Sequence, residues 1–272
     1  MTVKSEFMLR KTCLGAALAC LATAASAGVW TQPKGQGEAY LTTSYSHSSK
    51  GYASDGRVVD IGRYDKVLID LMIEYGLTDH TTVFVKPELR AVDVKAPGGA
   101  TQHSRGLGMS EAGVRHRFET QGPWLVSVQA SGFVPGSSNE RTNIAQAGAT
   151  DPEADIRILA GRNLPLPGEG GFVDLQGGYR LRDGNPPNEF RADLTLGWRP
   201  RPKVLLYAQS FNTWADGDGG GFYDYYQYHN VALNSAFTIA PKVTLQAGVF
   251  ATAGGRNALR ERGVTVGVWR RF

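Results

Sequence analysis

Cysteine is nearly absent from this sequence, and its two copies, Cys13 and Cys20, both lie within the first 27 residues. Residues 28–272 contain none, so they can form no disulfide bond. Small exported domains commonly depend on such bonds for their stability. If residues 28–272 are exported, their fold must be stabilised in another way.

Long apolar runs and basic blocks are also missing. No run after Ala27 approaches the ~20 apolar residues of a transmembrane helix. If this part of the chain spans a membrane, it must do so as a closed barrel, because an open sheet leaves unpaired backbone groups in hydrocarbon. Lys and Arg form no basic stripe, and the formal net charge is only +4. This balance argues against nucleic acid as a partner.

The first 27 residues have the features of a signal peptide. Arg10 and Lys11 precede an apolar run over 13–22, and Ala25-Ser26-Ala27 forms an Ala-x-Ala cleavage site. The run is too short for a spanning helix of ~20 residues. We therefore predict a signal peptide over 1–27 and a mature domain over 28–272. A lipoprotein cleaved before Cys20 is the alternative.

The strongest pattern in residues 28–272 is an alternation of apolar and polar side chains with a period of two. Between Val67 and Leu77 the odd positions are apolar, while the even positions include Asp70 and Glu74. A strand between lipid and a polar interior requires this split. Twelve segments are candidates for such strands: 38–47, 64–77, 81–94, 107–119, 124–135, 154–164, 172–183, 189–199, 204–214, 225–239, 243–253 and 260–272.

Twelve is even, as an antiparallel barrel with both ends on one side requires. Short and long connections also alternate along the chain, as periplasmic turns and extracellular loops do, except that the outer connections 184–188 and 254–259 are short. The short connections are 78–80, 120–123, 165–171, 200–202 and 240–242, and the long ones include 48–63, 95–106, 136–153 and 215–224. We predict an all-β fold, a closed antiparallel transmembrane β-barrel of about twelve strands. A soluble β-sandwich, whose strands also alternate, is the competing fold.

The end of the chain provides a separate signal. Val264, Val266 and Val268 alternate before the terminal Phe272, which resembles the C-terminal sorting signal of outer-membrane barrels. We therefore expect the outer-membrane assembly machinery as a partner and the Gram-negative cell outer membrane as the location, with outer-membrane lipid and lipopolysaccharide around the barrel. Aromatic residues near strand ends fit interfacial girdles: Tyr75, Phe118, Trp124, Trp198, Trp214, Phe222, Tyr223 and Tyr225.

One strand and its turn resemble a known family. The segment Glu74-Tyr75-Gly76-Leu77-Thr78-Asp79, followed by Thr81-Thr82-Val83, is similar to a strand-turn-strand of the porin-like barrels grouped under meta-pathway phenol degradation. The opening Trp30-Thr31-Gln32-Pro33-Lys34-Gly35 is similar to such proteins as well. This resemblance implies an outer-membrane, channel-like role without a defined substrate.

If the apolar face contacts lipid, the opposite face lines the interior. Charges of both signs occur there, and a slight excess of Arg favours anionic solutes such as carboxylates. We expect a basic wall, opposed by an acidic wall of Glu74, Glu88 and Glu111; the basic wall consists of Arg90, Arg115, Arg157, Arg180 and Arg191. The function that follows is passive diffusion or uptake of small polar or aromatic solutes through an outer-membrane channel. We expect the pore to be lined by Glu74, Lys86, Glu88, Arg90, Glu111, Arg115, Arg157, Arg180, Arg191 and Asp193.

Three alternatives stay open at this point. Salt bridges could fill the interior of a plugged, purely structural barrel, and the loop over 136–153 could fold inward or lie on the surface. An outer-membrane lipid hydrolase would need Ser or Asp near His116 or His229 on the lipid face, and no such Ser is evident, so we expect no enzyme. The acidic loop over 216–224 lacks calcium-loop spacing, so we expect no metal and no cofactor.

Overall fold

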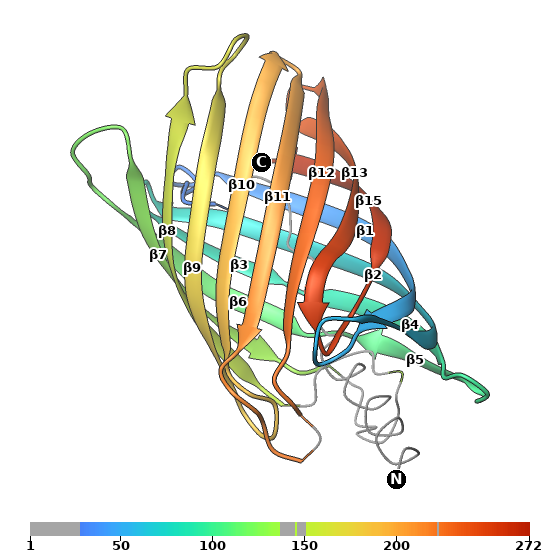
Figure 1. The fold of residues 1–272 in the computed structure, drawn as a ribbon. Coiled ribbons are helices and arrows are strands. Elements are labelled where there is room, and N and C mark those ends of the chain that lie inside the picture. The colour runs from blue at the N-terminus through green and yellow to red at the C-terminus, as the bar shows by residue number, and fades with distance from the viewer. Residues whose placement is uncertain (1–27, 137–144, 146–150, 222) are drawn as a thin grey trace.

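The regular structure consists of strands in the residues that the computed structural model describes, which are 28–136, 145, 151–221 and 223–272 (Figure 1). The predicted signal peptide lies outside these residues. Neighbouring strands pair antiparallel throughout the sheet. The first long strand, β1 (Gly37–Tyr52), pairs with β2 (Val58–Thr78) on one side and with β15 (Arg262–Arg271) on the other. The sheet therefore closes, and the predicted all-β barrel is confirmed.

Fifteen strand segments make twelve crossings of the wall. Pro87 separates β3 (Thr81–Lys86) from β4 (Glu88–Lys95), yet both pair with β2, so they form one crossing. Proline has no backbone N–H to donate, whereas its carbonyl still accepts from Leu71 N at 3.2 Å. Residues 108–109 separate β5 (Thr101–Leu107) from β6 (Ser110–Phe118). β5 pairs with β4 and β6 pairs with β3, so these two segments also form one crossing.

The short strand β14 (Ala258–Leu259) extends the pairing at the far end of β1. The remaining crossings follow in chain order around the wall. They are β7 (Leu125–Val134), β8 (Glu153–Leu164), β9 (Gly171–Arg182), β10 (Glu189–Arg201), β11 (Val204–Ala215), β12 (Gln227–Ala240) and β13 (Val243–Arg256).

The two faces of the wall have opposite chemistry. Outward positions carry exposed aliphatic side chains such as Ile158, at 66% exposure, and Leu233, at 65%. Inward positions such as Asp70 and Glu74 are buried. So large an apolar surface would be unfavourable in water, whereas lipid solvates it. No helix in the described part of the chain is long and apolar enough to cross a membrane.

Two of the predicted long loops are instead extensions of the wall. β1 runs to Tyr52 and β2 starts at Val58, so most of 48–63 is a hairpin, and 96–100 is the turn of a second one. Both segments were predicted as long connections, and the strands within them were missed, because strands that project beyond lipid need no apolar face. At the first tip, a hydrogen bond from Arg57 N lowers the pKa of Asp55.

The predicted short turns are confirmed, and all of them lie at one rim of the barrel. The start of β1 and the end of the chain after β15 meet at this rim. Gly37 N donates to Phe272 O at 3.2 Å, and Phe272 N donates to Gly37 O at 2.9 Å. Aromatic residues face outward near this rim, including Tyr75, Trp124 and Trp198, as predicted for a girdle. Phe222 lies outside the described residues. Following the predicted orientation, we call this end the periplasmic rim.

Candidate functional site

The interior of the barrel holds the ten charged residues that the alternation assigned to it. Eight of them are buried, the Arg157 side chain is 12% exposed, and Glu111 is half-buried opposite Lys86. Their position inside the wall follows from the strand register. Whether solute passes them remains a prediction.

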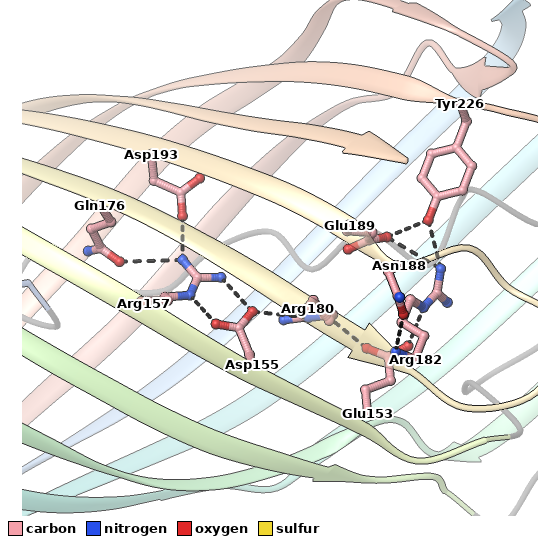
Figure 2. Close-up of polar contacts among 10 residues, drawn as sticks. All are labelled: Glu153, Asp155, Arg157, Gln176, Arg180, Arg182, Asn188, Glu189, Asp193 and Tyr226. Carbon is pink, nitrogen blue, oxygen red and sulfur yellow. Dashed lines mark hydrogen bonds and ion pairs between the residues drawn. The ribbon is translucent and has the colours of Figure 1, made fainter. Parts of the chain in front are cut away.

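A continuous chain of ion pairs follows the inner face of β8, β9 and β10 (Figure 2). Arg157 donates to Asp155 at 2.8 Å and to Asp193 at 2.7 Å. Arg180 donates to Asp155 at 3.2 Å and to Glu153 at 3.1 Å. Asp155 therefore lies between two guanidinium groups, and Asp193 lies beside one. This wall carries little unpaired charge.

The chain continues toward the extracellular loops through residues that sequence reasoning treated only in part. Arg182 donates to Glu153 at 2.8 Å and to Tyr226 Oη at 2.7 Å, and Tyr226 donates to Glu189 at 2.5 Å. Glu153 and Glu189 were missed because they are the first residues of their strands, where alternation has barely begun. Tyr226 and Tyr228 are buried on the inner face.

The opposite wall is paired in the same manner. Arg115 lies 3.0 Å from Glu74, and Arg90 lies 2.5 Å from Glu88. The expected arrangement, a basic wall containing Arg90 and Arg115 that faces an acidic wall, is therefore wrong. Arg90 and Glu88 lie two residues apart on β4, and Arg115 on β6 reaches Glu74 on β2 across β3, so pairing occurs within this wall.

Several buried polar atoms in the interior have no hydrogen-bond partner among the described residues. They include Thr42 Oγ1 and Asp70 Oδ1, which face each other across β1 and β2, and Arg191 Nε and Asp193 Oδ1 on β10. An unsatisfied buried polar group costs about 1–3 kcal/mol. Bound water is the usual partner of such groups. Water in the interior would satisfy these atoms.

Nearer the periplasmic rim, the interior is apolar. A packed cluster joins side chains from strands on different sides of the wall. Its members are Tyr40, Met72, Phe84, Phe172, Leu205, Tyr207, Ala236 and Trp269, with Trp30 packed against them. Trp30 meets Phe172 edge to face at 5.3 Å between ring centroids. The interior thus changes along the axis from charged to aromatic.

Residues 28–36, which precede β1, run inside the wall rather than outside it. Lys34 bridges to Gly76 on β2, and Gln32 N donates to Thr82 Oγ1 on β3 at 2.8 Å. Trp30 O accepts from Arg115 on β6 at 3.0 Å. The sequence did not reveal this placement, because these residues show no alternation and matched only a family motif.

The long loop over 136–153 has one described residue within 137–150, which is Ala145. It is fully buried and packs with Tyr64, Val92, Val94 and Leu259 on the inner face. Of the two alternatives for this loop, folding inward or lying on the surface, Ala145 follows the first.

Neither outward histidine forms part of a catalytic relay in the described residues. His116 Nδ1 lies 2.9 Å from Thr81 Oγ1 and carries no carboxylate partner. His229 Nδ1 lies 2.9 Å from Asn212 Oδ1, and the Asn212 amide donates to Ser210 Oγ at 3.1 Å. Asn212 thus separates Ser210 from the imidazole, which an activated serine would have to contact.

The described residues contain no group of three or more His, Cys, Asp or Glu side chains that could hold a metal ion. In the loop after β11, Asp216 accepts from Tyr179 Oη at 2.6 Å, and Asp218 accepts from Tyr225 N at 2.6 Å. These acidic side chains thus organise their own loop.

Comparisons with known proteins agree with this geometry. The model of the family described as "Putative MetA-pathway of phenol degradation" matches residues 51–272. No curated protein matches the sequence. An outer-membrane channel from Pseudomonas putida F1 superposes with a TM-score of 0.78 at 17% identity, over 92% of this chain and 100% of that one.

Two further solved structures share the architecture. The translocator domain of the autotransporter NalP from Neisseria meningitidis has a TM-score of 0.56 at 14% identity, over 89% of this chain and 90% of that one. The NanC porin has a TM-score of 0.52 at 9% identity, over 85% and 98%. These likenesses show the fold, which is that of an outer-membrane barrel.

Proposed function

The chain belongs to this phenol-degradation family, and we propose that it is an outer-membrane channel through which small polar or aromatic solutes diffuse along the charged lumen. The family resemblance found at Glu74-Tyr75-Gly76-Leu77-Thr78-Asp79 lies within the matched range and is confirmed. An outer-membrane location agrees with the apolar outer belt and with the fold.

The buried polar atoms without partners in the interior carry this proposal. About eight strands leave a barrel just filled by its own side chains, and wider barrels enclose cavities or channels. A barrel of twelve crossings is wider, so its inward side chains need not fill the whole interior. The unsatisfied atoms of Thr42, Asp70, Arg191 and Asp193 support water in that space.

The pairing of charges limits how strongly the channel can select solutes by their charge. Each described ion pair cancels much of its own field, so we expect size and polarity to select more than net charge. The Arg excess inferred from the sequence supports a modest preference for anionic solutes. The family description supports aromatic compounds as part of the solute class.

A plugged barrel is the second candidate, and the apolar cluster at the periplasmic rim favours it. Its side chains meet across the interior, and residues 28–36 lie on the same level. A barrel closed in this way would serve only a structural role unless the closure can open.

We expect outer-membrane lipid and lipopolysaccharide to surround the apolar belt of either barrel. The sorting signal remains a proposal as well. Val264, Val266, Val268 and Phe272 are all exposed on the outer face of the last crossing, where the assembly machinery has access to them.

Planar-bilayer recordings of the purified protein test the proposal. We expect discrete conductance steps, from the full mature chain or from a variant that lacks residues 28–36. Silence from both, with an intact barrel by circular dichroism, would contradict the channel and leave the plugged barrel.

A further inference from the structure

Five neighbouring strands carry a row of ionisable side chains on the outer face of the barrel. β15, β1, β2, β4 and β5 follow one another around this part of the wall (Figure 1). The register places one such residue of each strand directly opposite the next, in the order Arg262, His47, Asp65, Asp93 and His103. Two residues further along β2, the same face carries the exposed Val67. Charged side chains are unfavourable on a face that lipid covers, so the depth of this row in the membrane matters.

The row lies at the upper boundary of the apolar belt. From Glu38, opposite Arg271 near the periplasmic rim, β1 runs nine residue steps to His47, opposite Arg262. At about 3.4 Å per residue and a tilt of about 40°, these steps rise about 23 Å. The apolar band of an outer-membrane barrel is about 25 Å tall. The row therefore lies where acyl chains end and headgroups begin, in the outer leaflet if the barrel has the predicted orientation.

The two carboxylates of the row are compensated by their neighbours. Asp65 forms an ion pair with Arg63 and accepts a hydrogen bond from Tyr45 Oη at 2.7 Å. Asp93 lies 2.6 Å from His103 Nδ1. Tyr45 is 46% exposed, and a ring with a polar tip is typical of the membrane interface. These contacts leave no negative charge for the other cations at this level.

Three of those cations have no ionic partner. The side chains of Lys95, Arg105 and Arg262 are exposed and form no ion pair or hydrogen bond with another described residue. Lys95 also lies directly opposite Arg63, and like charges in such pairs repel each other. We call Arg63, Lys95, Arg105 and Arg262 the cationic patch. Its four positive charges exceed by two the charge of the carboxylates beside it, Asp65 and Asp93.

The same end of the barrel has the opposite charge on its far side. Asp183, which follows β9, and Asp216, which follows β11, are both exposed. Asp216 accepts a hydrogen bond from Tyr179 Oη and has no cation in that contact. The positive excess is therefore a property of one side of the wall and not of the whole rim.

Lipopolysaccharide has the chemistry that this position requires. Its phosphate groups are on a sugar headgroup directly above the acyl chains, and it occupies the outer leaflet. Arg binds phosphate through two parallel hydrogen bonds, Lys binds it as a point charge, and clusters of both at a membrane surface recognise anionic headgroups. Below the patch, exposed Val67, Leu89 and Val264 offer a surface to acyl chains. Above it, β1 and β2 continue beyond lipid, so a sugar headgroup has a wall to lie against.

We propose that the cationic patch is a binding site for the lipid A phosphates of lipopolysaccharide. Lipid that only surrounds the barrel would have no preferred position, whereas this site fixes one lipopolysaccharide molecule against β15, β1, β2, β4 and β5. The site depends on the predicted orientation of the barrel. It does not depend on whether the lumen conducts.

Native mass spectrometry of the full mature chain in nonionic detergent tests the site. The probes are lipid A with two phosphates, the same lipid A after dephosphorylation, and phosphatidylglycerol. The test variant removes the three cations without an ionic partner, by Lys95→Gln, Arg105→Gln and Arg262→Gln. The control variant removes the same charge from exposed positions at the periplasmic rim, by Arg201→Gln, Lys203→Gln and Lys242→Gln.

We expect the unaltered chain and the control variant to bind phosphorylated lipid A equally well, and the test variant to bind it at least about tenfold more weakly. Dephosphorylated lipid A and phosphatidylglycerol should bind weakly to all three proteins. Each of the three single substitutions in the patch should cause part of the loss, and these variants decide the matter if the triple variant does not fold.

Three results would overturn the site. Equal losses in the test and control variants would mean that net charge alone attracts the lipid. Equal binding of lipid A with and without phosphates would remove the role of the cations. Phosphatidylglycerol bound as tightly as phosphorylated lipid A would make the patch a general site for anionic lipids and not one for lipopolysaccharide.

Discussion

At the scale of single residues, Arg157 shows how a charge is accommodated within the barrel. Its side chain starts on β8, passes β9 at Gly178, and reaches Asp193 on β10. A Cβ at position 178 would meet Arg157 Cγ at 2.7 Å, so only glycine leaves room for this path. The guanidinium group thereby binds Asp155 on its own strand and links β8 to β10 through Asp193.

Replacement of Arg157 with Gln should therefore destabilise the barrel. It leaves Asp155 and Asp193 without their shared cation, and the loss of one partner from a buried pair costs about 3 kcal/mol. Urea unfolding in detergent micelles measures the change. Arg57→Gln, at an exposed hairpin tip, is the control and should leave the unfolding midpoint unchanged. Equal midpoints for the two variants would contradict the structural role of the ion-pair chain.

Arg191 belongs to the same wall and should influence ion selectivity. Its Nε has no hydrogen-bond partner among the described residues, so part of its charge is available to a passing anion. Replacement with Gln should shift the reversal potential in a salt gradient toward cation preference. Arg201→Gln, at the exposed end of β10, should not. An identical shift in both variants would mean that the path does not pass Arg191.

At the scale of the elements, alternation predicted every crossing of the wall because each strand separates lipid from a polar interior. β2 illustrates both the success and its limit. Its segment from Val67 to Leu77 alternates and was predicted, whereas its start at Val58 was not, since both faces there lie beyond lipid. The inner placement of residues 28–36 was likewise hidden, because it depends on tertiary contacts with six strands and not on a local period.

The outer face of β12 provides a prediction at this scale. Leu233 lies midway along the strand, and Ile239 lies on the same face near the periplasmic rim. An Arg at the middle of the bilayer costs about 2–4 kcal/mol, and near the interface about 0–1 kcal/mol. We expect Leu233→Arg to lower the free energy of unfolding in lipid vesicles by the larger amount and Ile239→Arg by the smaller. The reverse order would mean that the strand crosses the membrane at another depth.

At the scale of the whole molecule, closure between β1 and β15 is what makes a membrane-spanning sheet possible. The pairing extends from Glu38 opposite Arg271 to His47 opposite Arg262, so neither strand has a free edge along this length. The ends of the chain are thus joined by backbone hydrogen bonds that form only when the wall is complete.

Such closed barrels should resist sodium dodecyl sulfate until they are heated. We expect unboiled protein to migrate differently from boiled protein on a gel, because the detergent unfolds the barrel only on heating. Identical migration of the two samples would contradict a stable closed wall.

The most direct test of the central claim, that lipid covers the outside while water fills the inside, is a cysteine scan of β2 in lipid vesicles. Single cysteines replace residues 67–73 in turn, and a charged, membrane-impermeant thiol reagent is added to the folded protein. We predict labelling at the inward positions Leu68 and Asp70, protection at Met72, which packs in the apolar cluster, and protection at the outward positions Val67, Ile69, Leu71 and Ile73. Labelling of the outward set, or equal labelling of both, would contradict the account.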